Sequence, residues 1–196
     1  VSQAAQEKQA EALPVVILLG DSIRMNYQQT VVAELKRKAT VWSPKENCRH
    51  TEFVLENLEK WVKGRNASVV HINVGLHDMF LSSATGQPRH SLEVYEGNLR
   101  AIFTKLQELT DAKIIFALTT PVIESRQAAS EGYKRVVRRE ADVVRYNARA
   151  AQIAKETGIE VNDVHGLSIR VGTDDVLRES DGIHLSKVGE EVIGKH

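Results

Sequence analysis

Short apolar runs alternate along the chain with segments whose apolar residues recur at helical spacing. Runs rich in β-branched residues predict strands, and apolar positions at steps of three and four predict amphipathic helices. The predicted strands are Val15–Leu19, Ala39–Trp42, Ser68–Val74, Lys113–Leu118 and Ile159–Val161. The predicted helices are Gln28–Arg37, Thr51–Lys63 with Thr51 as its cap, Leu92–Leu106, Val137–Ala151 with Gly158 as the stop after it, and Leu185–Val192.

Strands that alternate with helices predict an α/β fold, in which a five-stranded parallel sheet lies between two layers of helices. The chain of 196 residues is long enough to bury one full core without disulfides. We therefore expect a single α/β/α domain over residues 13–196, after a flexible polar lead-in over residues 1–12.

Two connections are longer than such a fold requires, 79–90 after the third strand and 121–132 after the fourth. Both leave from the carboxyl edge of a parallel sheet, where α/β proteins build their sites. They are interpreted either as walls of a substrate pocket or as surface insertions.

Charge and composition exclude several classes of partner. Lysine plus arginine equals aspartate plus glutamate at 26 each, so no global field attracts nucleic acid. A basic run shares its predicted helix with Glu140 and Asp142 and is interpreted as a solvated helix face; it comprises Lys134, Arg135, Arg138, Arg139, Arg145 and Arg149. No apolar run is long enough for a bilayer span, so we expect no integral membrane association.

The chain begins without an initiator methionine, which suits either an excised segment or a mature exported protein. Our expectation for the compartment is secreted or periplasmic, with cytoplasmic as the alternative. The single cysteine, Cys48, cannot form an internal disulfide and does not decide between them.

The sequence Gly20-Asp21-Ser22-Ile23 follows directly on the first predicted strand, and Asp181-Gly182-Ile183-His184 precedes the last predicted helix. A serine hydroxyl becomes a good nucleophile when a base takes its proton, and an imidazole held by a carboxylate is such a base. Ser22, His184 and Asp181 therefore form a candidate catalytic set. The alternative for each motif alone is a plain turn or a helix cap.

These two blocks, with Gly75-Leu76-His77-Asp78 between them, resemble the first, fifth and third blocks of the GDSL or SGNH hydrolases. The resemblance covers the chain from Val15 to Val192. It implies a flavodoxin-like fold, cleavage of acyl esters without a metal, and roles for Ser22 as nucleophile, His184 as base and Asp181 as its partner.

The chain departs from that family in the groups that would bind the oxyanion. The second block of the family has a glycine, where this chain has Asn47-Cys48-Arg49-His50-Thr51, so Cys48 N–H, Arg49 N–H or the Asn47 amide is the candidate donor. The third block has an asparagine where this chain has His77, and a neutral imidazole can also donate one N–H. Gly75, in the same block, is placed beside the substrate by the resemblance. Asn73 is interpreted as an interior strand residue rather than a second donor.

The other histidines show no spacing typical of a metal site, so neither a metal nor a cofactor is predicted; they are His50, His71, His90, His165 and His196. His71 is interpreted as a satisfied core residue. The expected function is a serine ester hydrolase that forms an acyl-enzyme at Ser22. Polar loop residues favour a small or carbohydrate ester, such as an O-acetylated sugar. The alternatives are a binding module without catalysis, or an acyl hydrolase of the lysophospholipase or thioesterase type.

Overall fold

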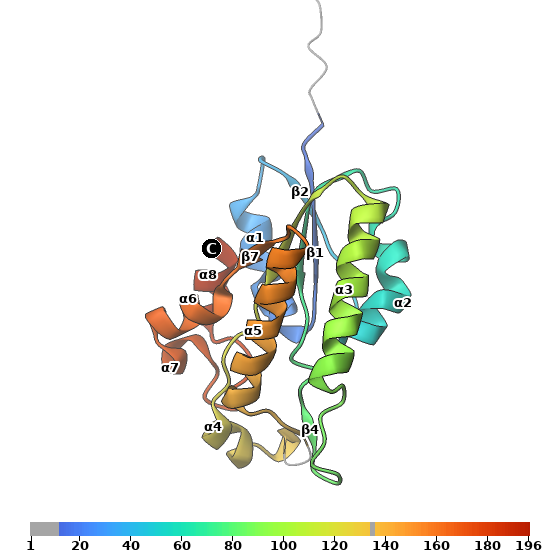
Figure 1. Ribbon diagram of the computed structural model, residues 1–196. Helices are drawn as coiled ribbons and strands as arrows, with labels where there is room; N and C mark the ends of the chain where they lie inside the picture. Colours follow the sequence, from blue (N-terminus) through green and yellow to red (C-terminus); the bar gives the residue numbers. More distant parts are fainter. Residues whose placement is uncertain (1–11, 134–135) are drawn as a thin grey trace, which may run out of the picture.

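The computed structural model describes residues 12–133 and 136–196 (Figure 1). A five-stranded parallel sheet in the order β2-β1-β3-β5-β7 forms its centre. These strands are β1 (Val15–Gly20), β2 (Thr40–Trp42), β3 (Ala67–Asn73), β5 (Lys113–Ala117) and β7 (Glu160–Asn162). The predicted α/β fold with a five-stranded parallel sheet is confirmed.

Helices cover both faces of this sheet, as the α/β/α prediction requires. On one face α2 packs on α3 and α3 on α5, and on the other α8 packs on α1 and α6 (Figure 1). The helices are α1 (Ser22–Glu34), α2 (Thr51–Val62), α3 (Leu92–Leu109), α4 (Glu124–Ala129), α5 (Glu140–Glu156), α6 (Val164–Val171), α7 (Thr173–Val176) and α8 (Lys187–Lys195), with a 3₁₀ turn η1 (Glu131–Tyr133).

The core forms where the apolar helix stripes meet the strands. Ile17 and Leu19 of β1 and Phe116 of β5 are fully buried. On α2, Leu58 and Trp61 point into the same cluster. A strand in the middle of a sheet covered on both faces is apolar at almost every position, which explains the continuous apolar run that predicted β1.

Helix boundaries differ from the predictions most clearly in α1. It begins at Ser22, where the apolar pattern predicted Gln28, because the Asp21 carboxylate accepts the N–H of Ile23 at 2.9 Å and caps the helix. The cap of α2 is also different. His50 accepts the Phe53 N–H through Nδ1 at 3.3 Å, whereas Thr51, the predicted cap, is the first helical residue.

Two short helices, α6 and α7, lie between β7 and the predicted final helix, where no helix was predicted. The final helix itself is shifted, since α8 starts at Lys187 after its cap Ser186. The segment 163–186 thus carries two helices, and its apolar residues Val164, Val176 and Leu177 are buried in the core.

The two long connections are joined to each other. Leu81–Ser82 (β4), in the first, pairs antiparallel with Val136–Val137 (β6), just beyond the second, and α4 lies within the second. Residues 1–11 of the predicted lead-in over residues 1–12, and the basic residues Lys134 and Arg135, lie outside the described residues. Across the described ranges, no helix has the length and apolar character needed to cross a membrane.

Candidate active site

Ser22 stands at the carboxyl edge of the sheet, as the first residue of α1 directly beyond β1. The turn that presents it is tight at Gly20, where an added Cβ would lie 2.6 Å from Cβ of Arg24. Asp21 is fully buried while Ser22 is partly exposed. The turn therefore presents the hydroxyl at the head of a helix, where the peptide dipoles favour negative charge.

His184 meets Ser22 from the loop before α8. Its Nε2 lies 3.0 Å from Ser22 Oγ, and its Nδ1 lies 3.0 Å from Oδ2 of Asp181. The loop is fixed to α1 by a hydrogen bond from Leu185 N–H to the Asn26 side chain at 3.1 Å. The three residues that the sequence predicted as a set thus form a continuous chain of hydrogen-bonding distances.

Asp181 is held in the form that can orient an imidazole. Burial alone would raise its pKa, but the backbone N–H groups of His184 and Ile183 and the His184 side chain together lower it. Both N–H groups donate to Oδ1 at 2.8 Å, which leaves Oδ2 for the imidazole. An ionised Asp181 therefore favours the tautomer in which His184 Nδ1 carries the proton and Nε2 accepts from Ser22.

His77 lies in the turn after β3, at the family's asparagine position, and is mostly buried. Burial lowers its pKa to about 3, and the positive charges of Arg138, Arg89, His50 and His184 add to this shift. His77 is therefore a neutral imidazole at any pH near neutrality. One of its nitrogens carries a hydrogen that it can donate.

The segment at the family's second block runs alongside the turn that carries Ser22. Cys48 N–H donates to the Gly20 carbonyl at 3.1 Å, and its buried Sγ accepts from Gly20 N–H at 3.3 Å. The Cys48 N–H is therefore engaged and is not free to bind an oxyanion. Burial raises the pKa of the Cys48 thiol, so it is protonated at neutral pH.

Arg49 has the backbone conformation expected of the missing glycine, with a φ of 53° in the left-handed region. Its N–H donates to Oδ1 of Asn47 at 2.7 Å. Of the three candidates in this segment, only Arg49 has the left-handed backbone that favours glycine, and a rotation of the Asn47 side chain would free its N–H.

Gly75 and Asn73 support the site from within. Gly75 has a φ of 149°, its carbonyl accepts the N–H groups of Asp78 and Met79, and an added Cβ would lie 3.0 Å from Oγ1 of Thr119. Asn73 is buried and donates through Nδ2 to the Ala117 carbonyl at 3.1 Å, as the interior interpretation predicted.

Asp78 joins the second and third blocks. Its Oδ1 accepts the Thr51 hydroxyl at 2.6 Å, and both its oxygens accept the Thr51 N–H at 3.1 Å. Nδ1 of His90 lies 2.7 Å from the same Oδ1. Asp78 therefore fixes the start of α2 against the turn that carries His77.

The prediction that Arg138 lies on a solvated helix face is wrong. The residue lies before α5, is buried, and donates through Nε to the Leu76 carbonyl at 3.0 Å beside His77. Gln127 of α4 holds its backbone by accepting Arg138 N–H and donating to its carbonyl. Only its position in a basic run was visible in the sequence, and that pattern is typical of an exposed helix.

His71 also differs from its prediction. Its Nε2 lies 3.4 Å from Nδ2 of Asn162, but Nδ1 is buried without a hydrogen-bond partner among the described residues. His50 and His90, which no spacing connected, come together at the rim of the site with Glu52.

Comparison with known proteins agrees with the fold and with the expected family. The chain is 29% identical over 199 residues to an isoamyl acetate-hydrolyzing esterase 1 homolog of Bos taurus. The aligned region covers 93% of this chain and 79% of that relative. The GDSL esterase/lipase CPRD49 of Arabidopsis thaliana is 29% identical over 130 residues, or 64% of this chain and 51% of the relative.

Two solved structures share the fold. A lipase/acylhydrolase from Enterococcus faecalis superposes with a TM-score of 0.76 at 20% identity, over 93% of this chain and 92% of that chain. The acetylxylan esterase Axe2 from Geobacillus stearothermophilus superposes with a TM-score of 0.71 at 17% identity, over 94% and 92%.

The model of the GDSL-like lipase/acylhydrolase family matches residues 18–192, which span the blocks that carry Ser22, His77 and His184. The expected resemblance is thereby confirmed. The chain belongs to the GDSL-like lipase/acylhydrolase family and is an ester hydrolase of that family.

Proposed function

We propose that this protein hydrolyses acyl esters through a covalent intermediate on Ser22, with small acyl groups and polar alcohols as its substrates. The observation that carries the proposal is the chain from Ser22 Oγ through His184 to Asp181, with 3.0 Å at each step. This is the arrangement of nucleophile, base and orienting carboxylate that acyl transfer requires.

In the first step Ser22 Oγ attacks the acyl carbonyl carbon while His184 Nε2 takes the hydroxyl proton. The tetrahedral intermediate then collapses, its bond to the alcohol oxygen breaks, and His184 returns the proton to the leaving alcohol. In the second half a water attacks the acyl carbon while His184 Nε2 takes its proton; the bond from that carbon to Ser22 Oγ then breaks, His184 returns the proton to Ser22 Oγ, and the carboxylic acid leaves. The proton balance closes within each half of the cycle.

The oxyanion would be bound by the N–H of Ser22 at the head of α1, by the neutral His77 imidazole, and by Arg49 N–H after Asn47 turns away. Donors directed at the developing charge commonly contribute the largest part of the rate enhancement in acyl transfer. A neutral His77 suits this role because it donates without altering the charge beside His184.

Small acyl groups are favoured by the names of the similar proteins, which include an isoamyl acetate-hydrolyzing esterase homolog and an acetylxylan esterase. A polar alcohol is favoured by the residues of the loop beside the nucleophile. Asn47 and His50 are partly exposed there, and Arg49 is exposed. Hydrogen-bonding side chains of this kind suit an O-acetylated carbohydrate better than a long lipid chain.

The first test is hydrolysis of p-nitrophenyl acetate by wild type and by Ser22→Ala. We expect the variant to lose at least about 10³-fold in kcat, because removal of the nucleophile of a triad leaves only the catalysis of the remaining site. A fluorophosphonate probe should label wild type and spare the variant. Ser83→Ala, at an exposed loop position, is the matched control and should behave as wild type in both assays.

Equal turnover by wild type and Ser22→Ala would overturn the mechanism. The substrate class is tested separately, by comparing kcat/KM for acetylated xylo-oligosaccharides, isoamyl acetate, a lysophospholipid and an acyl thioester. Preference for the lysophospholipid or the thioester would leave Ser22 in place and refute the proposed substrates.

A further inference from the structure

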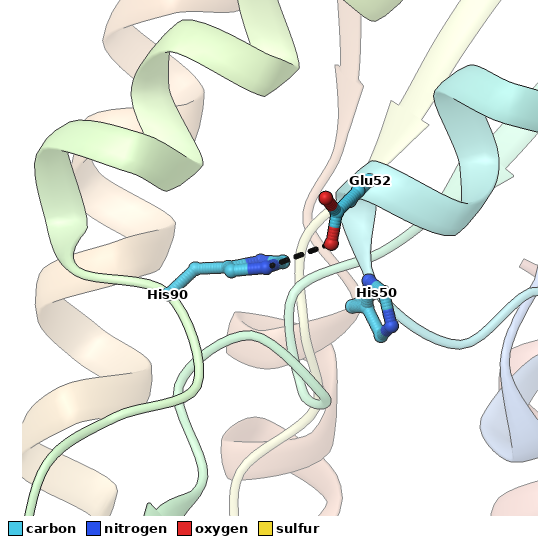
Figure 2. Close-up of side chains that lie close together, drawn as sticks. All are labelled: His50, Glu52 and His90. Atoms are coloured by element: carbon cyan, nitrogen blue, oxygen red, sulfur yellow. Dashed lines mark ion pairs between the residues drawn. The ribbon is translucent and has the colours of Figure 1, made fainter.

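Two histidines and a glutamate converge where the second block meets the end of the first long connection (Figure 2). His50 caps α2, Glu52 lies in its first turn, and His90 immediately precedes Ser91, the cap of α3. One nitrogen or oxygen from each of the three side chains lies within 4.8 Å of the others. His90 Nε2 is 3.5 Å from Oε2 of Glu52, and the two imidazole rings meet edge to face at 5.1 Å between centroids.

His90 is oriented from behind by a buried carboxylate. Its Nδ1 lies 2.7 Å from Oδ1 of Asp78, whose side chain is fully buried. An acceptor at that distance places the imidazole hydrogen on Nδ1, which leaves the lone pair of Nε2 directed toward Glu52. Histidines that bind metals are commonly held in this way by a carboxylate on their second nitrogen, which fixes the ring and strengthens the ligand.

We propose that His50, Glu52 and His90 bind a divalent transition-metal ion of the zinc type, with Asp78 as the outer partner of His90. Two imidazoles and one carboxylate are the ligands that zinc takes in open three-ligand sites, with water in the fourth position. Magnesium and calcium prefer sites built of oxygen alone, so the two nitrogens select against them.

The local charges set limits on the affinity. Glu52 supplies one negative charge as a direct ligand of the ion. Asp78 supplies a second negative charge on the far side of the His90 ring. The nearby cations oppose binding: Arg49 lies over the Phe53 ring, Arg89 lies over the Phe80 ring, and Arg89 contributes to the lowered pKa of His50. With three ligands and two opposing guanidinium groups, the site should bind zinc less tightly than a closed four-ligand site.

Coordination also competes with the cap of α2. His50 Nδ1 accepts the Phe53 N–H, and a neutral imidazole has one lone pair in the ring plane for either purpose. If the ion takes Nδ1, the cap is lost directly. If it takes Nε2, the hydrogen moves to Nδ1, which then cannot accept. Because the capping bond is long at 3.3 Å, its loss is a modest cost.

An ion held in this way would link the start of α2 to the segment before α3. Asp78 already joins these two places through Thr51 and His90. The metal would close a second link on the exposed side, at the rim beside His77. We therefore expect zinc to stabilise the fold as well as to bind.

The test is a calorimetric titration of the full chain with zinc, without any ester substrate. We expect one equivalent bound by wild type and at least about tenfold weaker binding by Glu52→Gln and by His90→Ala. Glu52 is well exposed, with 63% of its side chain accessible, so its variant will fold. Zinc at about 100 times its Kd should raise the unfolding midpoint of wild type by roughly 5 to 10 °C.

Two controls separate this site from others. His165→Ala removes another histidine with a glutamate partner, 2.8 Å from Glu140, and should bind zinc as wild type does. His184→Ala should also retain binding, because the active-site imidazole is not a ligand in the proposal. The proposal is overturned if wild type shows no saturable binding, if Glu52→Gln and His90→Ala both bind as wild type does, or if His184→Ala alone abolishes binding.

Discussion

At the scale of single residues, the chain differs from its family at two positions of the candidate site. Arg49 adopts the left-handed backbone that glycine would take most easily, with a φ of 53°. His77 stands where the family has an asparagine, and its burial keeps it neutral. Each position keeps an N–H group, in the backbone of Arg49 and on the ring of His77, and the proposed mechanism uses these two groups to bind the oxyanion.

The role of His77 can be tested by comparing two substitutions. His77→Ala should lower kcat for p-nitrophenyl acetate by about 10² to 10³-fold, the usual effect of removing one oxyanion donor. His77→Asn, which restores the family's donor, should recover most of that loss. Steady-state kinetics over pH 5 to 9 gives the second readout. Because the pKa of His77 is about 3, its titration lies below this range and the wild-type and His77→Asn profiles should have the same shape.

An unchanged kcat in His77→Ala would remove this residue from the oxyanion site. A shift of the acidic limb in His77→Asn would mean that His77 titrates during catalysis, which the buried neutral imidazole does not allow.

At the scale of elements, the geometry of the candidate triad depends on how α1 packs against α8. Ser22 begins α1, and His184 lies in the loop that leads into α8. The two helices contact each other at Gly194, where an added Cβ would lie 2.5 Å from Cβ of Thr30. The absence of a side chain at this one position therefore allows the close approach of α1, which begins with Ser22, to α8, which follows His184.

Gly194→Ala should separate α1 from α8 and lower the free energy of unfolding by about 1 to 3 kcal/mol, as overpacking does. Because the same displacement moves His184 relative to Ser22, kcat should fall more than KM changes. The matched control is Gly97→Ala, in the exposed middle of α3, where nothing lies within 4 Å of an added Cβ. That change should stabilise by about 0.5 to 1 kcal/mol through helix propensity alone and leave kcat unchanged. Urea denaturation with kinetics on the same samples distinguishes the two.

At the scale of the whole molecule, buried ionisable groups make stability depend on pH in two opposite directions. Burial raises the pKa of Asp21 from 3.8 to about 6, so the native state binds its proton more tightly than the unfolded chain. Its contribution to stability therefore falls as pH rises from about 4 to about 6. Burial lowers the pKa of His71 from 6.5 to about 4, so the native state binds this proton less tightly than the unfolded chain does. The contribution of His71 to the free energy of unfolding is therefore fully present above pH 6.5 and is lost as pH falls toward 4.

Asp21→Asn isolates the first of these effects. Asparagine caps a helix as well as aspartate does, and the substitution removes a charge whose Oδ2 is buried without a hydrogen-bond partner in the described part of the chain. At pH 7 we expect the variant to be more stable by roughly 1 to 3 kcal/mol, from a shift of about two units at 1.36 kcal/mol each. The difference should shrink as pH falls below 6 and approach zero below about pH 3, where Asp21 is protonated in both the folded and the unfolded state.

Urea denaturation at several pH values measures this difference directly. Asp163→Asn is the matched control, because Asp163 caps α6 in an exposed position and the exchange should matter little at any pH. A variant of Asp21 that is no more stable than wild type at pH 7 would show that the charge is compensated in the native state.

Long apolar stretches made the sheet and the long helices predictable from sequence. The strand at Val15 is a continuous apolar run, and the helix from Leu92 repeats its apolar positions over many residues. The position of Ser22 at the edge of the sheet followed from the first of these. Shorter features lacked such a signal. The β4–β6 pair consists of two residues on each side and forms only because distant segments meet. Arg138 was misplaced for a related reason, since a basic pattern does not show that the helix begins only at Glu140 and that the side chain before it is buried.

The pairing of β4 with β6 has a consequence for any attempt to redesign substrate preference. This pair joins the connection that leaves the sheet after β3 to the connection that leaves it after β5. The two connections, here called the two arms, therefore hold each other in place. Inserting one residue into the strand of either arm would shift the register in which β4 pairs with β6. Libraries that diversify both arms together, with Leu81 and Val137 left intact, should therefore yield more folded members than libraries that randomise one arm through its strand.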